Sequence, residues 1–379
     1  MTSGEPADDA FNEQEWQRFV AHLQGTLVSE GAEDFLAGQR RWFESNRERL
    51  AAKFDDIAAS QGGTPNPLNN PFLTFQDQTG YDSVFAKQIF TPILEKALAA
   101  ARQLGLSIQR PVVLANAPSV EPSPSGWPSA DKHILFIGQG TSSFCNYWSK
   151  IFAATIYAIA KIPEAERSSE AAILAVRDAA VILPGIKLLM RYVRSDSMLG
   201  FGEFKQDSRL DFHRLEICRS METFIVGHEL GHFILHERHP ETNGVPPGMT
   251  LKEMELGCDA LGFAICRAVG DAERSETSRH LIGPALLFYA LRLCDDVGYM
   301  VLEQPSSESE THPSPQERIQ DLFSYAEMVA PAGDLVVPIE EALDYAIVLG
   351  SQVKVALFRA SAEREPDDDD IARRLRPNQ

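Results

Sequence analysis

The chain has 379 residues, of which 44% are hydrophobic, and a formal net charge of −19. This length predicts two or three domains of about 150 residues each, or one large domain with elaborations, and the hydrophobic fraction excludes a wholly disordered chain. The negative charge repels phosphate groups, which argues against nonspecific binding to nucleic acids or anionic lipids.

The N-terminus and the cysteines predict a cytoplasmic protein without a membrane span. Residues 1–15 are polar and acidic and lack the basic and apolar regions of a secretory signal. The most apolar runs, residues 151–162 and 171–193, are too short for a bilayer or are interrupted by charged residues and proline. The five cysteines are an odd number without CxxC spacing, which fits neither a disulfide framework nor a cysteine-rich zinc site.

Helical periodicity dominates the N-terminal part of the chain. Apolar and charged residues alternate at helical spacing from Asp9 to Ser60, which predicts two or three amphipathic helices. A stretch rich in Gly, Pro and Asn at 61–71 ends this pattern. Thr91, followed by Pro92, then predicts the start of a helix that extends to about Leu104.

The segment 117–131 is rich in Pro and Ser, and we expect it to form a linker or long loop. Residues 133–137 then predict a strand, and residues 144–162 an apolar helix. The GQGTSS sequence between them resembles a phosphate-binding loop. It lacks the third glycine of GxGxxG and the GK[ST] ending of a P-loop, which favours a plain strand-to-helix turn over a nucleotide site.

Further elements are predicted with less detail. Residues 168–193 predict one helix or two with a kink at Pro184, and residues 194–214 a loop with short strands. The apolar segment 336–358 is expected to pack on the core. Residues 363–379 contain four consecutive aspartates without the spacing of a calcium-binding loop, which predicts a solvated acidic tail.

The most informative segment runs from Phe224 to His236 and contains an HExxH motif in an apolar, helical pattern. In a helix, His228 and His232 lie one turn apart on the same face, so both imidazoles can bind one tetrahedral zinc ion. Glu229 follows the first histidine, where its carboxylate can act on water at the metal without binding the metal. The alternative is an amphipathic helix whose histidines only border the core.

Catalytic zinc needs a third protein ligand. The HExxHxxGxxH arrangement is excluded because Leu235 and Arg238 occupy the positions of its glycine and its third histidine. His236 and His239 belong to no ligand pattern, and we expect them at the surface or beside the ligands. A second helix must therefore supply the third ligand.

Such a helix is predicted after Thr250, which forms a capping box with Glu253, and it extends to about Gly270. Glu255 and Asp259 lie one turn apart on one face of this helix. Glu255 can bind zinc, while Asp259 can accept the N–H of a zinc-binding histidine and fix its tautomer. Glu253 is the alternative ligand, but it is needed at the cap and points about 160° away.

Another helix start is predicted at Ser314, which is followed by Pro315 and Glu317. His312 precedes this helix, and Arg318 lies about one turn inside it. Both residues are of a type that stabilises an oxyanion or orients a zinc ligand. An ordinary capped surface helix explains the same pattern.

These segments together resemble the gluzincin metallopeptidases of the type that includes the bacterial heat-shock protease HtpX and the eukaryotic CAAX prenyl endopeptidases. The matching sequences are HELGH from His228, ELGCDALGF from Glu255 and THPSPQERI from Thr311. They correspond to HExxH, ExxxD and HPxxxxR in that family. HELGHFILH is also similar, more weakly, to the ImmA/IrrE-type regulatory peptidases.

The resemblance implies a role for each motif residue. The implied ligands of one Zn²⁺ ion are His228, His232 and Glu255. Glu229 is implied to be the general base and later the proton donor, and Asp259 to orient a ligand. The catalytic residues His312 and Arg318 are implied to lie near the substrate or the transition state.

The expected function is that of a zinc-dependent endopeptidase that cleaves a protein or peptide substrate, in a regulatory, stress or phage response. The alternative is a non-catalytic, zinc-stabilised protein that recognises a partner through its N-terminal half. The membrane relatives span the bilayer around their catalytic core, whereas no span is predicted here. Residues 1–200 match no motif, and we expect specificity to lie there. The sequence predicts no oligomeric state.

The expected fold class is α+β and predominantly helical, with a zincin-like core built on the HExxH helix and a second ligand helix. The expected segments are a helical N-terminal region (1–116), a linker or loop (117–131), the metallopeptidase core (132–330), a C-terminal packing segment (331–362) and an acidic tail (363–379).

Overall fold

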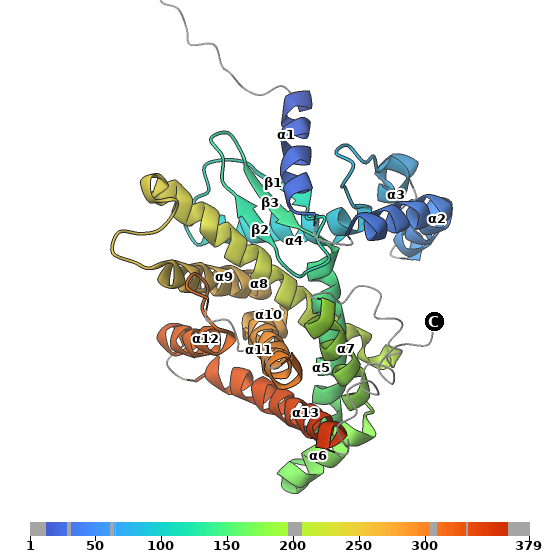
Figure 1. The fold of residues 1–379 in the computed structure, drawn as a ribbon, viewed down its shortest axis with the longest axis vertical. Helices are drawn as coiled ribbons and strands as arrows, with labels where there is room; N and C mark the ends of the chain where they lie inside the picture. Colours follow the sequence, from blue (N-terminus) through green and yellow to red (C-terminus); the bar gives the residue numbers. More distant parts are fainter. Residues whose placement is uncertain are drawn as a thin grey trace, which may run out of the picture.

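The computed structural model describes residues 13–28, 32–60, 64, 66–195, 207–302, 309–330 and 333–362. These residues form a predominantly helical α+β fold with one three-stranded sheet (Figure 1). This confirms the expected fold class at that level. None of the described helices is long and apolar enough to cross a membrane. The predicted acidic tail at 363–379 and residues 1–12 lie outside the described residues.

Two of the expected amphipathic helices are present as α1 (Glu13–Thr26) and α2 (Ala32–Ser60), and the short helices η1 (Pro67–Asn69) and α3 (Pro71–Thr74) follow them. The predicted helix start at Thr91 is wrong, because α4 spans Val84–Gln103 and contains Pro92 in its interior. The side chain of Ser83 caps α4 by accepting the N–H of Ala86. Apolar residues on both sides of the proline are buried, and this burial outweighs the one backbone hydrogen bond that proline removes.

The sheet contains β1 (Val112–Asn116), β2 (Ser125–Trp127) and β3 (His133–Ile137) in the order β1-β3-β2. Strand β3 is fully buried, pairs in parallel with β1 and antiparallel with β2, and confirms the strand predicted at 133–137. The Pro/Ser-rich segment 117–131 is a long connection between two strands of the same sheet. It carries β2, which the sequence did not predict.

Helix α5 (Gln139–Ala160) begins directly after β3 and Gly138. The GQGTSS sequence is therefore not a separate turn, because all but its first residue lie in the first turns of α5. The predicted segment at 168–193 forms two helices, α6 (Ser169–Asp178) and α7 (Ile182–Ser195). They are separated at Ala180, whose φ is 54°, rather than kinked at the proline.

The remaining helices form the part of the molecule around the HExxH segment. Their order is η3 (Ser208–Leu210), α8 (Asp211–Arg238), η4 (Pro240–Thr242), α9 (Leu251–Glu273), α10 (Glu276–Arg279), α11 (Ile282–Leu302), α12 (Pro315–Val329) and α13 (Val336–Ala362), with η2 (Glu164–Glu166) between α5 and α6. Helix α8 starts at Asp211, inside the predicted loop 194–214, of which residues 196–206 lie outside the description. In Figure 1 the sheet lies above α8, and α11 to α13 lie below it.

One hydrophobic core unites most of these helices. It contains side chains from α4 and α5, from α8 and α9, and from α11, α12 and α13. The C-terminal helix contributes Ile339, Leu349 and Val353, which are fully buried, so the expected packing of this segment on the core is confirmed. Helix α4, from the expected N-terminal region, shares the same core.

Candidate metal centre

Two glycines on α8 allow α9 to approach it unusually closely. A Cβ atom added at Gly227 would lie 3.1 Å from the Cα of Gly262, and one at Gly231 would lie 3.0 Å from the Cα of Cys258. These contacts are tighter than ordinary van der Waals packing, so larger residues at either glycine would push the helices apart. The close crossing brings the histidines of α8 opposite the acids of α9.

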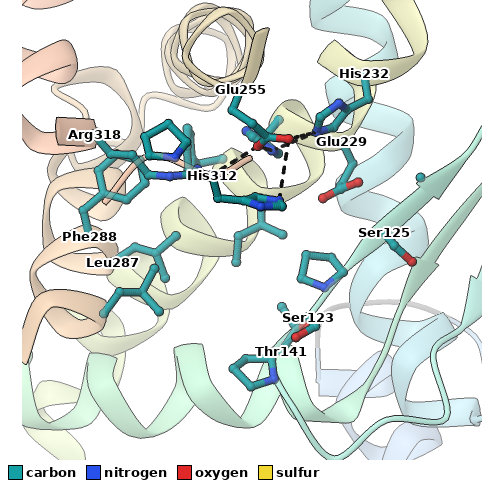
Figure 2. A pocket seen from close by; sticks show the side chains of 18 of the residues that line it. Ser123, Ser125, Thr141, Glu229, His232, Glu255, Leu287, Phe288, His312 and Arg318 are labelled. Atoms are coloured by element: carbon teal, nitrogen blue, oxygen red, sulfur yellow. Dashed lines mark hydrogen bonds and ion pairs between the residues drawn. The ribbon is translucent and has the colours of Figure 1, made fainter. Parts of the chain in front are cut away.

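His228, His232 and Glu255 meet at this crossing, and Figure 2 labels His232 and Glu255. One ligand atom from each lies within 4.8 Å of the other two. The two Nε2 atoms are 3.1 Å apart, and the carboxylate oxygens of Glu255 lie 3.4 Å from the Nε2 of His228 and 3.5 Å from that of His232. Tetrahedral zinc with ligands at about 2.05 Å requires ligand atoms about 3.3 Å apart. The donor set therefore fits zinc, and the two Nε2 atoms lie about one tetrahedral edge apart.

Asp259 lies behind the first histidine. Its Oδ1 is 2.8 Å from the Nδ1 of His228, and its side chain is fully buried. Burial opposes the charged imidazolium, but the hydrogen bonds with Asp259 and Glu255 outweigh burial and raise the pKa of His228 to about 9. When a metal occupies Nε2, the proton at Nδ1 is donated to Asp259, which fixes the tautomer and the ring orientation.

The other two residues of the cluster have the charges that a metal would require. Burial, together with the nearby charge of His228, lowers the pKa of His232 to about 4. Burial favours the neutral form of Glu255, but the hydrogen bond and the charge of His228 outweigh it and lower the pKa of Glu255 to about 2. Around neutral pH, His232 is therefore neutral and Glu255 is ionised, the states in which both bind metals.

Glu229 projects into the cavity beside the three ligand residues. Figure 2 shows its carboxylate between His232 and the strand that carries Ser125. The side chain is buried, and it accepts a hydrogen bond from the backbone N–H of Gly126. Burial raises the pKa of Glu229 to about 7. A carboxyl group poised near neutral pH suits proton transfer in both directions.

Arg318 lies beside the two acids of the cluster and lines the same cavity. It comes from α12, and its Nη1 donates to Oδ1 of Asp259 at 2.8 Å, while its Nη2 donates to Oε2 of Glu255 at 3.4 Å. The guanidinium also lies over the ring of Phe288, 5.8 Å from its centroid. Arg318 therefore neutralises the two acids of the cluster and lines the cavity from behind them.

His312 lies at the mouth of the same cavity. The predicted capping box of Ser314 and Glu317 and the proline at the start of α12 are all present. His312 precedes this cap, and its Nε2 is 3.7 Å from Oε1 of Glu255. Its side chain is 61% exposed, so it is free to contact a bound molecule.

The alternative ligands lie elsewhere. Glu253 caps α9, where its Oε2 accepts the backbone N–H of Thr250 at 2.7 Å. His239 directly follows α8 and is its C-cap residue. His236 lines the cavity, but its ring packs edge-on against that of His133.

The three ligand residues open into a cavity of about 590 Å³. Its walls are formed by segment 122–128, which contains β2, and by apolar side chains of α5, α8 and α11. These apolar wall residues are Phe144, Phe224, Ile225, Leu287, Phe288 and Leu291. No sequence motif marks them as cavity residues, although Phe224 and Ile225 lie in the segment that carries HExxH.

The chain matches none of the family models, curated proteins or solved structures with which it was compared. The resemblance to gluzincins therefore rests on the motif residues and on the geometry of the cluster that they form.

Proposed function

We propose that the chain is a zinc-dependent endopeptidase with a zincin-like core. His228, His232 and Glu255 hold one Zn²⁺ ion in this proposal. The supporting observation is that two imidazole nitrogens and a carboxylate oxygen lie within 4.8 Å of one another, with the two Nε2 atoms 3.1 Å apart. Bound zinc supplies Lewis acidity, which acidifies water and polarises a carbonyl group.

The position of Glu229 favours a catalytic metal site over a structural one. This residue contributes no ligand atom to the cluster, yet its carboxylate lies in the cavity beside it. In the proposed reaction Glu229 removes a proton from the attacking water and later returns it to the leaving amine. His312, exposed at the mouth, is placed to donate a hydrogen bond to the carbonyl oxygen as it gains charge.

The cavity favours an extended peptide as the substrate. Strand β2 is an edge strand that pairs with β3 on one side, and residues of its segment line the cavity. An edge strand offers backbone groups to which an extended chain can add as a further strand, although the N–H of Gly126 already donates to Glu229. The apolar wall opposite suits a large apolar side chain next to the cleaved bond. A regulatory substrate in a stress or phage response is part of this proposal.

The non-catalytic alternative keeps the zinc but assigns the function to partner recognition by the N-terminal half. The substitution Glu229→Gln separates the two, because it removes the proton acceptor and leaves all three ligand residues in place. Under the proposal this variant retains zinc and loses about 10³-fold or more in cleavage rate.

The measurement compares new protein N-termini in cells that express the wild type with those in cells that express Glu229→Gln. The proposal expects cleavage sites that occur only with the wild type and that disappear with a chelator. Identical sets of N-termini from both proteins, with zinc bound in both, would support the non-catalytic alternative.

A further inference from the structure

The two histidines of the cluster differ in the group that contacts Nδ1, the ring nitrogen that points away from the proposed metal. The Nδ1 of His228 faces the carboxylate of Asp259 at 2.8 Å. The Nδ1 of His232 instead faces the thiol of Cys258, whose Sγ lies 3.4 Å away. Cys258 is fully buried and occupies the position next to Asp259 on α9.

The direction of this hydrogen bond follows from the chemistry of imidazole. A neutral histidine that offers the lone pair of Nε2 to a metal carries its proton on Nδ1. The Nδ1–H of His232 must then be the donor, and the sulfur of Cys258 the acceptor. Because the sulfur faces Nδ1, on the other side of the ring from the ligand atom, Cys258 is not itself placed to bind the metal.

The helix crossing holds Cys258 in this position. Residues three and four apart share a helix face, so Glu255 and Cys258 both face α8. The backbone of α8 approaches so closely at Gly231 that a Cβ there would lie 3.2 Å from the Cβ of Cys258. A short side chain with an acceptor atom fits this gap.

We propose that Cys258 is a positioning residue that accepts the Nδ1–H of His232 and so presents its Nε2 to the metal. This inference rests on the metal centre proposed above. Sulfur is a weak acceptor. The metal centre thus combines one histidine held by a carboxylate with another held by a thiol.

The test compares Cys258→Ala with Cys258→Ser. Both substitutions remove the volume of sulfur, but only serine keeps an acceptor atom. We expect alanine to weaken zinc binding by about 10- to 100-fold, the usual effect of losing a group that orients a metal-binding histidine. Serine should change the affinity by less than about threefold. Zinc affinity is measured by competition with a chromophoric chelator, and the visible spectrum of the Co²⁺-loaded protein reports the ligand geometry.

Cys266→Ala provides a matched control. Cys266 lies two turns further along α9, is equally buried, and contacts backbone oxygens of Ser220 and Ser278 rather than the cluster. We expect this variant to bind zinc and Co²⁺ like the wild type. Circular dichroism of the metal-free proteins verifies that each variant is folded.

Equal losses in the alanine and serine variants would overturn the inference, because they would assign the effect to packing. Wild-type affinity in the alanine variant would overturn it as well. A wild-type chain that binds no zinc would contradict the metal centre itself, and that result is distinct from either of the other two.

Discussion

Helix α8 contributes to two buried polar sites, one in which an acid has a lowered pKa and one in which an acid has a raised pKa. At the end of α8 that carries the proposed metal ligands, the acids Glu255 and Asp259 are surrounded by histidines and by Arg318. Less than two turns earlier, Glu222 is buried beside the thiols of Cys145 and Cys218. Burial raises the pKa of Glu222 to about 8, and the hydrogen bond with Cys218 and the charge of Arg219 offset this only in part.

The difference shows what each site is suited to do. Contacts with His228 keep Glu255 charged despite burial, and charged oxygen atoms are what a metal ion binds. Glu222 avoids the cost of a buried charge by holding a proton instead. One site is prepared for a cation, and the other behaves as part of the core.

Removing the guanidinium that pairs with Glu255 and Asp259 should destabilise the protein most. Arg318→Met leaves the buried Asp259 and Glu255 without their guanidinium, and we expect a loss of about 3–5 kcal/mol in the free energy of unfolding, measured with urea. Arg279→Met is the control, because the pair of Arg279 with Asp271 is half exposed and should contribute less than about 1 kcal/mol. Similar small losses in both variants would contradict the proposed role of Arg318.

The two sites also differ in how the pH should affect stability. Because the pKa of Glu222 is raised from 4.5 to about 8, the folded state binds more protons than the unfolded state between these values. Its contribution to the free energy of unfolding therefore falls as the pH rises through this window, by up to about 1.4 kcal/mol per pH unit.

Glu222→Gln should abolish this contribution, so its stability should exceed that of the wild type increasingly toward pH 8. Urea unfolding at several pH values measures the difference, with Glu48→Gln on the exposed surface of α2 as the control. A difference that does not change with pH would show that Glu222 is charged in the folded protein.

A smaller effect is expected from closing the space between β2 and α8. A Cβ at Gly126 would lie 2.8 Å from Cε1 of Phe233 and 3.4 Å from Oε2 of Glu229. Gly126→Ala should destabilise the protein by about 1–3 kcal/mol and reduce cleavage by displacing Glu229.

The control is Gly38→Ala, since a Cβ at Gly38 meets no atom within 4 Å and the residue lies inside α2. That variant should be as stable as the wild type or gain up to about 1 kcal/mol. Full cleavage by a folded Gly126→Ala variant would show that β2 does not position Glu229.

The sequence predicted the elements that carry local signals. The capping box at Thr250 placed Glu253 at the helix start and Glu255 toward α8, and the structure has this arrangement. The cap at Ser314 likewise located the helix that carries Arg318. Such signals depend only on residues close in the sequence, so they can be recognised without the tertiary structure.

Other features depend on contacts between distant segments and were missed or misplaced. Strand β2 has three residues, too few for an alternating pattern, and it exists because it pairs with β3. The ion pairs of Arg318 and the contact of Cys258 with His232 join residues from different helices. No spacing rule within one helix predicts them.

The most direct test of the account is the zinc content of two glutamate variants of α9. After dialysis, elemental analysis should find one zinc ion per chain in the wild type and in Glu253→Gln, which alters only the helix cap. Glu255→Gln should lose most of its zinc, because the neutral amide replaces the anionic ligand. Full zinc content in Glu255→Gln, or its loss in Glu253→Gln alone, would contradict the metal centre described here.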